Sequence, residues 1–124
     1  MTRQEEQDLR LEKICRVVPC VPFKGIDRFY DIGGLLKDPF AFQLAIDILL
    51  ERYSSKQDTF TAIGAFDARG FLIAPILGLA LKKKVFMLRK PGKMPTVAAS
   101  VEYRKVIYVF IILIKNSQHH CLFL

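Results

Sequence analysis

The residues with the most specific chemistry lie at positions 67–70, where the sequence reads Asp-Ala-Arg-Gly. The continuous apolar run 62–66 predicts a buried parallel strand, and apolar residues at helical spacing follow the turn. Gly70 lets a ligand approach the backbone, the first N–H groups of a helix attract anions, and the planar guanidinium of Arg69 suits phosphate. The turn therefore predicts an anion site. The alternative is that Arg69 only pairs with Asp67.

A second cationic loop, residues 89–93, follows the apolar run 85–88, which predicts a second parallel strand. Its three cations are Arg89, Lys90 and Lys93. Proline and glycine end the strand here, and ligands of open α/β sheets bind at the carboxyl ends of the strands. We therefore expect both loops at one sheet edge. The lysines at 82–84 extend the basic run, or serve only the end of the preceding helix.

The composition narrows the class of protein. The 124 residues carry a net charge of +7, which predicts an anionic partner: a phosphate compound, a nucleic acid or a membrane surface. Because the excess is concentrated in one loop, a small polyanion is favoured. Three cysteines without metal-like pairing predict reduced thiols in the cytoplasm. The charged N-terminus does not read as a secretory signal, and no apolar run reaches the length of a membrane span.

The remaining elements provide a scaffold. Residues 3–16 predict an amphipathic helix, 17–23 an extended segment, and 24–34 a loop that holds Phe29 and Tyr30. Asp38 and Pro39 predict the start of a helix. Its expected core face consists of Phe42, Ala45, Ile46, Leu49 and Leu50.

Taken together, several stretches resemble a known family. AFDARGFL resembles the strand and loop with which purine phosphoribosyltransferases, and the adenine phosphoribosyltransferases in particular, hold pyrophosphate. Four more stretches agree in order: VPFKGIDRFYDI, LLKDP, LRKPGKMP and VEYRK. The resemblance runs from Ile14 to Lys105. It implies an α/β fold of the type I phosphoribosyltransferase kind, a parallel sheet flanked by helices that is incomplete at the C-terminus.

The resemblance also implies an activity, adenine phosphoribosyltransferase. Such an enzyme forms AMP and pyrophosphate from adenine and phosphoribosyl pyrophosphate in purine salvage, with Mg²⁺ held mainly through the substrate, as a homodimer. The implied pyrophosphate-binding residues are Asp67, Ala68, Arg69, Gly70, Arg89, Lys90 and Lys93. Arg28, Phe29 and Tyr30 would bind adenine, although Tyr30 stands where the family has arginine and the aromatic pair could simply pack on the core. Glu102 would be the catalytic carboxylate, and the Asp67–Ala68 bond would be a cis peptide.

The resemblance stops after Lys105, so residues 1–105 are expected to form the phosphoribosyltransferase-like domain and 106–124 a divergent hydrophobic tail. Val106–Ile114 could form a buried strand, but we favour the tail because the family's 5-phosphate motif does not follow. The sequence His119-His120-Cys121 is weak evidence for metal. Two alternatives remain: an inactive isoform that only binds purine or pyrophosphate, or pairs with a full-length subunit, and a nucleic-acid module. The second lacks a helical basic stripe.

Overall fold

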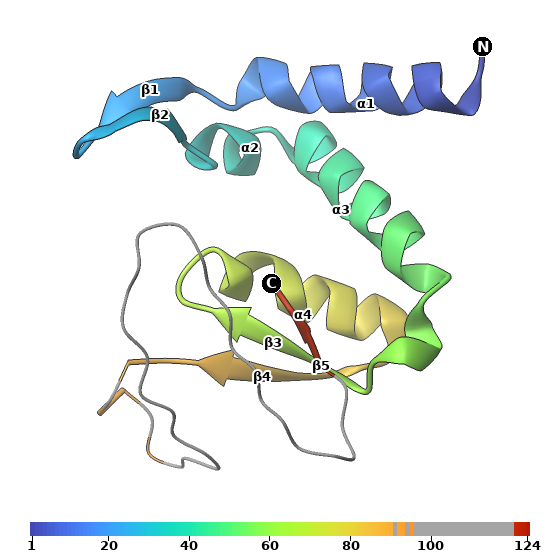
Figure 1. Ribbon diagram of the computed structural model, residues 1–124, viewed down its shortest axis with the longest axis vertical. Coiled ribbons are helices and arrows are strands. Elements are labelled where there is room, and N and C mark those ends of the chain that lie inside the picture. The colour runs from blue at the N-terminus through green and yellow to red at the C-terminus, as the bar shows by residue number, and fades with distance from the viewer. Residues whose placement is uncertain (91, 94, 96–120) are drawn as a thin grey trace. The chain divides into compact units, whose positions relative to one another are not determined.

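The computed structural model describes residues 1–90, 92, 93, 95 and 121–124. The chain forms two compact units, Met1–Ser55 and Lys56–Leu124 (Figure 1).

Three helices and a hairpin make up the first unit. Helix α1 (Arg3–Val17) begins with a capping box, in which the Thr2 hydroxyl accepts from the Glu5 N–H and the Glu5 carboxylate accepts from the Thr2 N–H. α1 contacts both the short α2 (Gly33–Lys37) and α3 (Pro39–Ser54). The helix predicted at 3–16 is thus confirmed.

Helix α3 begins as its sequence predicts. The Asp38 carboxylate accepts hydrogen bonds of 3.0 Å from the N–H groups of Phe40 and Ala41, and Pro39 occupies the first helical position. Of the expected core face, Ile46 is buried and the other four residues are half-buried. This face therefore packs within the unit, as expected of a scaffold helix.

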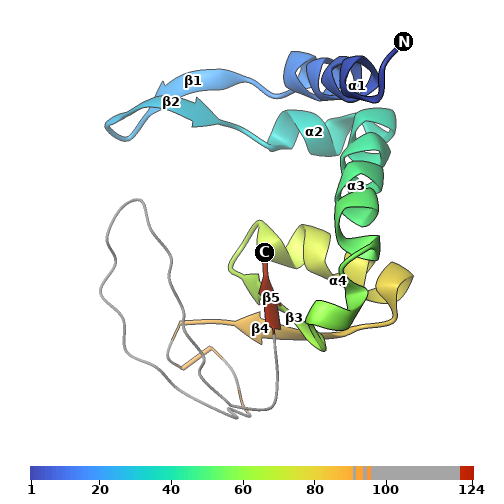
Figure 2. The same cartoon turned by 45° about the vertical axis from the view of Figure 1, so that its right-hand side comes forward.

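Residues 24–34 are not the loop that we predicted. Strands β1 (Cys20–Phe23) and β2 (Ile26–Tyr30) pair antiparallel, and the hairpin extends away from the helices of its unit (Figure 2). Lys24 and Gly25 form the turn, with φ values of 46° and 78°. Left-handed backbone at both turn positions matches the twist of the two strands, so the chain reverses within two residues.

The second unit is built on a parallel sheet. Strand β3 (Ala62–Phe66) lies between β4 (Lys84–Leu88) and β5 (Cys121–Phe123), and both neighbours run parallel to it. A 3₁₀ turn, Gln57–Thr59, precedes β3. Helix α4 (Gly70–Leu81) connects β3 to β4 and lies along the sheet (Figure 1). The predicted strand–turn–helix–strand order is confirmed.

The core of this unit lies between the sheet and α4. Ile63 on β3 and Leu77 on α4 are its largest fully buried side chains. Gly78 permits close packing, because a Cβ there would collide with the Val85 side chain. The helix ends at Leu81, and Lys82 forms the C-terminal cap in a left-handed conformation (φ 56°). In the portion of the chain with described coordinates, no helix combines the length and apolarity that crossing a bilayer requires.

Candidate active site

The turn between β3 and α4 forms the centre of the candidate site. It leaves the carboxyl end of β3 and enters α4 directly, since the Phe71 N–H donates to the Ala68 carbonyl (3.2 Å) and the Leu72 N–H to the Arg69 carbonyl (3.1 Å). The Asp67–Ala68 peptide is cis, as the resemblance implied. Asp67, Ala68 and Arg69 are exposed. The turn is therefore open to a ligand at the sheet edge.

Gly70 is buried, and its lack of a side chain has a reason that the sequence did not reveal. A Cβ at this position would collide with the backbone carbonyl of Leu124. That carbonyl accepts from the Phe66 N–H at 2.9 Å, so the chain following β5 stays paired to β3. Packing against backbone thus requires glycine here, independently of any ligand.

Arg89, directly after β4, connects the two loops. Its Nη2 lies 3.9 Å from Oδ2 of Asp67, its Nη1 donates to the Lys93 carbonyl at 3.4 Å, and its guanidinium carbon lies 5.7 Å from the centroid of the Phe71 ring. The expectation that both loops reach one sheet edge is confirmed at this residue. The structure thus brings an acidic, a basic and an aromatic side chain together beside the start of α4.

The second loop turns back at Gly92, which has a φ of 78°. The Lys93 N–H donates to the Lys90 carbonyl at 3.2 Å and closes the turn. Both lysines are exposed. Their ammonium groups are available to an anion at the edge that Arg69 and Arg89 share.

The residues expected to bind adenine lie on the hairpin of the first unit. Phe29 is half-buried, and its ring centroid lies 5.0 Å from that of Phe23, at an interplanar angle of 43°. Arg28 and Tyr30 are exposed. Phe29 therefore packs partly on another aromatic ring, which fits both the binding and the packing interpretation.

Sequence reasoning missed two aromatic residues, Phe23 and Phe71. Lys24 Nζ lies 5.4 Å from the Phe23 ring centroid, so each of these rings has a cation over it. The signal for Phe71 was available: a large aromatic residue stands directly after the glycine at which a helix begins. Its partner, Arg89, could not be identified from the sequence, because Arg89 follows a different strand.

Four of the predicted features lie outside the described residues. They are Glu102, the boundary at Lys105, the segment Val106–Ile114 and the pair His119-His120. Strand β5, just beyond them, was not predicted at all. Within the described ranges, no three histidine, cysteine, aspartate or glutamate side chains gather as a metal site would require.

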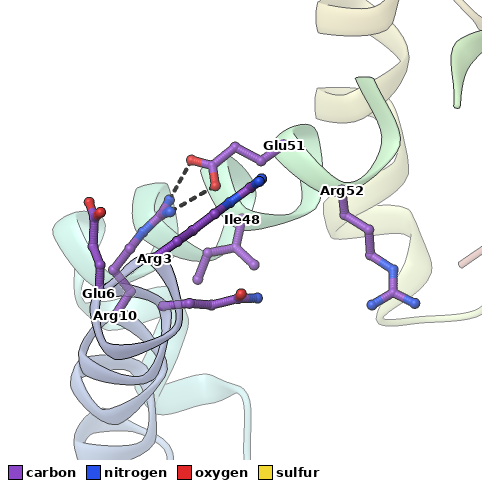
Figure 3. A pocket seen from close by; sticks show the side chains of 7 residues that line it. Arg3, Glu6, Arg10, Ile48, Glu51 and Arg52 are labelled. Carbon is purple, nitrogen blue, oxygen red and sulfur yellow. Dashed lines mark hydrogen bonds and ion pairs between the residues drawn. The ribbon is translucent and has the colours of Figure 1, made fainter. Parts of the chain in front are cut away.

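A separate cavity of about 350 Å³ lies in the first unit, where α1 and α3 meet (Figure 3). Arg10 and Glu51 form a two-pronged ion pair across it, with both N–O distances at 2.8 Å. The hydrogen bonds from Arg10 lower the pKa of Glu51. Arg52 extends away from this pair. We interpret the cavity as part of the α1–α3 packing, since two of its charges already neutralise each other.

The comparisons with known proteins agree with this geometry. No family model matches the chain. It is 46% identical over 88 residues to the adenine phosphoribosyltransferase of Chlorobium luteolum, covering 71% of this chain and 49% of that protein. It is 43% identical over 103 residues to adenine phosphoribosyltransferase 3 of Arabidopsis thaliana, covering 81% and 55%. The chain spans about half the length of the curated relatives that it matches.

Solved structures show the same relationship. The adenine phosphoribosyltransferase of Thermoanaerobacter pseudethanolicus superposes with a TM-score of 0.64 at 38% identity, over 75% of this chain and 55% of that one. The Trypanosoma brucei enzyme, solved with AMP, pyrophosphate and ribose-5-phosphate, gives 0.62 at 27% identity, over 71% and 39%. The fold is that of the type I phosphoribosyltransferases. Within that class, the chain belongs to the adenine phosphoribosyltransferase family.

Proposed function

We propose that the protein is an adenine phosphoribosyltransferase of purine salvage, which forms AMP and pyrophosphate from adenine and phosphoribosyl pyrophosphate. The observation that carries the proposal is the placing of Asp67, Arg89 and Lys93 together at the sheet edge where α4 begins. Relatives with this name over the same stretch of chain support it.

The proposed reaction needs cations more than it needs a strong nucleophile. As the bond from the anomeric carbon to pyrophosphate breaks, negative charge grows on the leaving group and positive charge on the sugar. Fixed donors aimed at that growing negative charge lower the barrier. Arg69, Arg89, Lys90 and Lys93 would supply them. The N–H groups of Phe71 and Leu72 at the start of α4 already donate within the turn. The carboxylate of Asp67 repels an anion, so it would affect pyrophosphate binding only through Arg89, for which it competes with the anion.

Adenine would be recognised by the hairpin residues Arg28, Phe29 and Tyr30. The half-buried Phe29 ring offers a face for stacking on a purine. Glu102 would accept or hold a proton at the imidazole edge of the base.

Magnesium would enter with the substrate. The described residues provide no cluster of three protein ligands, whereas a pyrophosphate and two ribose hydroxyls provide the oxygen ligands that Mg²⁺ prefers. Its chemistry would be partial neutralisation of the pyrophosphate charge, added to that of the protein cations.

The proposal extends to a cytoplasmic homodimer, with residues 1–105 as the phosphoribosyltransferase-like part. Cys15 and Cys20 are exposed free thiols, a state typical of a reducing compartment.

The test is calorimetric binding of magnesium pyrophosphate to wild type and to Arg69→Ala. We expect at least about a tenfold loss of affinity, equivalent to about 1.4 kcal/mol for a charge-assisted contact. Lys84→Ala is the matched control, because it removes one exposed cation at the opposite end of β4. Equal affinities in all three proteins would contradict the pyrophosphate site and leave Arg69 as a structural partner.

Activity is tested separately, with adenine, phosphoribosyl pyrophosphate and Mg²⁺, by detecting AMP. AMP formation that Glu102→Gln abolishes would support the full proposal. A chain that binds pyrophosphate but forms no AMP would favour the binding-only alternative.

A further inference from the structure

Among the described residues, Arg89 has three contacts of unequal quality at the site. Its distance of 3.9 Å from Asp67 exceeds that of a direct hydrogen bond, and its 3.4 Å contact to the Lys93 carbonyl is longer than a well-formed one. The third contact is the Phe71 ring, which lies under the guanidinium at 5.7 Å. The polar contacts alone therefore fix the side chain weakly.

Phe71 is well placed to do more. It is the second residue of α4, so its backbone is fixed by the helix, and its side chain is half-buried. An aromatic side chain has only two rotatable bonds, and a planar guanidinium stacks on its face more effectively than an ammonium does. The ring can therefore keep the guanidinium beside the start of α4 while Nη1 and Nη2 remain near Lys93 and Asp67.

We propose that Phe71 is a positioning residue that holds the Arg89 guanidinium at the pyrophosphate edge. This inference rests on the proposed function, in which Arg89 binds pyrophosphate. Pre-ordering a long side chain removes an entropic cost that the ligand would otherwise meet on binding. Phe71 thus contributes to affinity without touching the ligand.

The test compares Phe71→Leu, which removes the ring, with Phe71→Tyr, which keeps it. By calorimetry with magnesium pyrophosphate, we expect a loss of about twofold to fivefold for leucine, the range of a partly exposed cation–π contact, and near wild-type affinity for tyrosine. Phe60→Leu is the matched control. The Phe60 ring also lies under a cation, with Lys83 Nζ 5.2 Å from its centroid. Phe60, however, precedes β3 at the opposite edge of the sheet and is only 4% exposed.

A double-mutant cycle separates positioning from general packing. In an Arg89→Gln background, Phe71→Leu should cause no further loss of affinity, because the group that it positions is gone. An equal loss in both backgrounds would overturn the inference, as would wild-type affinity in Phe71→Leu.

A readout without ligand keeps the inference decidable if pyrophosphate does not bind at all, an outcome that would count against the proposed function. A proton held over a ring face resonates upfield, so the Arg89 Nε–H signal should be shifted upfield in wild type and in Phe71→Tyr. In Phe71→Leu it should move to the ordinary position, while the Phe60→Leu signal stays shifted. If the Arg89 Nε–H of a folded Phe71→Leu protein keeps the chemical shift of wild type, the inference is overturned. If the leucine variant fails to fold, the inference is overturned when this proton has no upfield shift in wild type or in Phe71→Tyr.

Discussion

The carboxylate of Asp67 should weaken pyrophosphate binding, and Asp67→Asn should therefore strengthen it. The substitution keeps the shape of the side chain but removes the negative charge that competes with an incoming anion for Arg89. Over the 3.9 Å that separates Oδ2 from Nη2, two unit charges attract with about 1 kcal/mol in water and about 4 kcal/mol at an effective dielectric constant of 20.

The side chains of Arg89 and Asp67 are 32% and 37% exposed, so the lower value applies after solvent screening. About 1 kcal/mol corresponds to about a fivefold gain in affinity. Because Phe71 still holds the guanidinium, the gain is not offset by a loss of position. Calorimetry with magnesium pyrophosphate measures it, and high salt should reduce it.

Asp58→Asn is the control, since it removes an exposed acid from the 3₁₀ turn before β3, at the other sheet edge. Weaker binding by Asp67→Asn, with the control unchanged, would refute the reasoning. It would show that the carboxylate is needed to place Arg89.

Three further predictions concern stability. Gly78→Ala should lower the free energy of unfolding by about 1–3 kcal/mol in chemical denaturation, because the new Cβ collides with the Val85 side chain. Ile63→Val should cost about 1 kcal/mol, since this residue is fully buried in β3. The third concerns acid. The pKa of Glu51 is lowered by its hydrogen bonds from Arg10, so the pair stabilises the chain above the ordinary pKa of 4.5 and is lost as pH falls through the lowered value. As the pH falls from 4.5 through the lowered pKa of Glu51, the melting temperature should therefore fall less in Glu51→Gln than in wild type.

Each of these has a contrary outcome. Wild-type stability of Gly78→Ala would mean that the Val85 side chain moves aside at little cost. A loss of several kcal/mol for Ile63→Val would indicate that the sheet rearranges around the cavity. Parallel pH profiles for Glu51→Gln and wild type would mean that the exposed pair with Arg10 contributes nothing measurable, as many surface pairs do.

Elements of the fold could be predicted where the local sequence pattern agrees with the place of the element in the folded chain. The run 62–66 is apolar without interruption, and β3 is the central strand of the sheet, packed against α4 with its middle three residues buried. Its turn residues mark where it stops. Asp38 and Pro39 similarly mark the start of α3. A short window of sequence contains all the information that these elements need.

The hairpin was missed because its turn is unusual. Lys24 adopts left-handed backbone, where asparagine, aspartate or glycine is the common signal, so the pattern looked like an irregular loop. The Phe71–Arg89 contact was missed for a different reason. It joins a helix to the end of a strand, and only side-chain geometry decides which ring an arginine covers.

The two pairings of β3 differ in how far apart their partners lie along the chain, and that difference bears on how the sheet assembles. Ala62 pairs with Lys84 in β4 after a single helical crossover, but with Cys121 in β5 only after a much longer stretch of chain. Closing a longer loop costs more entropy and slows contact formation. We therefore expect β3, α4 and β4 to form first and β5 to dock last. Hydrogen exchange should show the same order in reverse, with the Leu124 N–H, bonded to the Gly64 carbonyl at 2.9 Å, exchanging before the amides shared by β3 and β4.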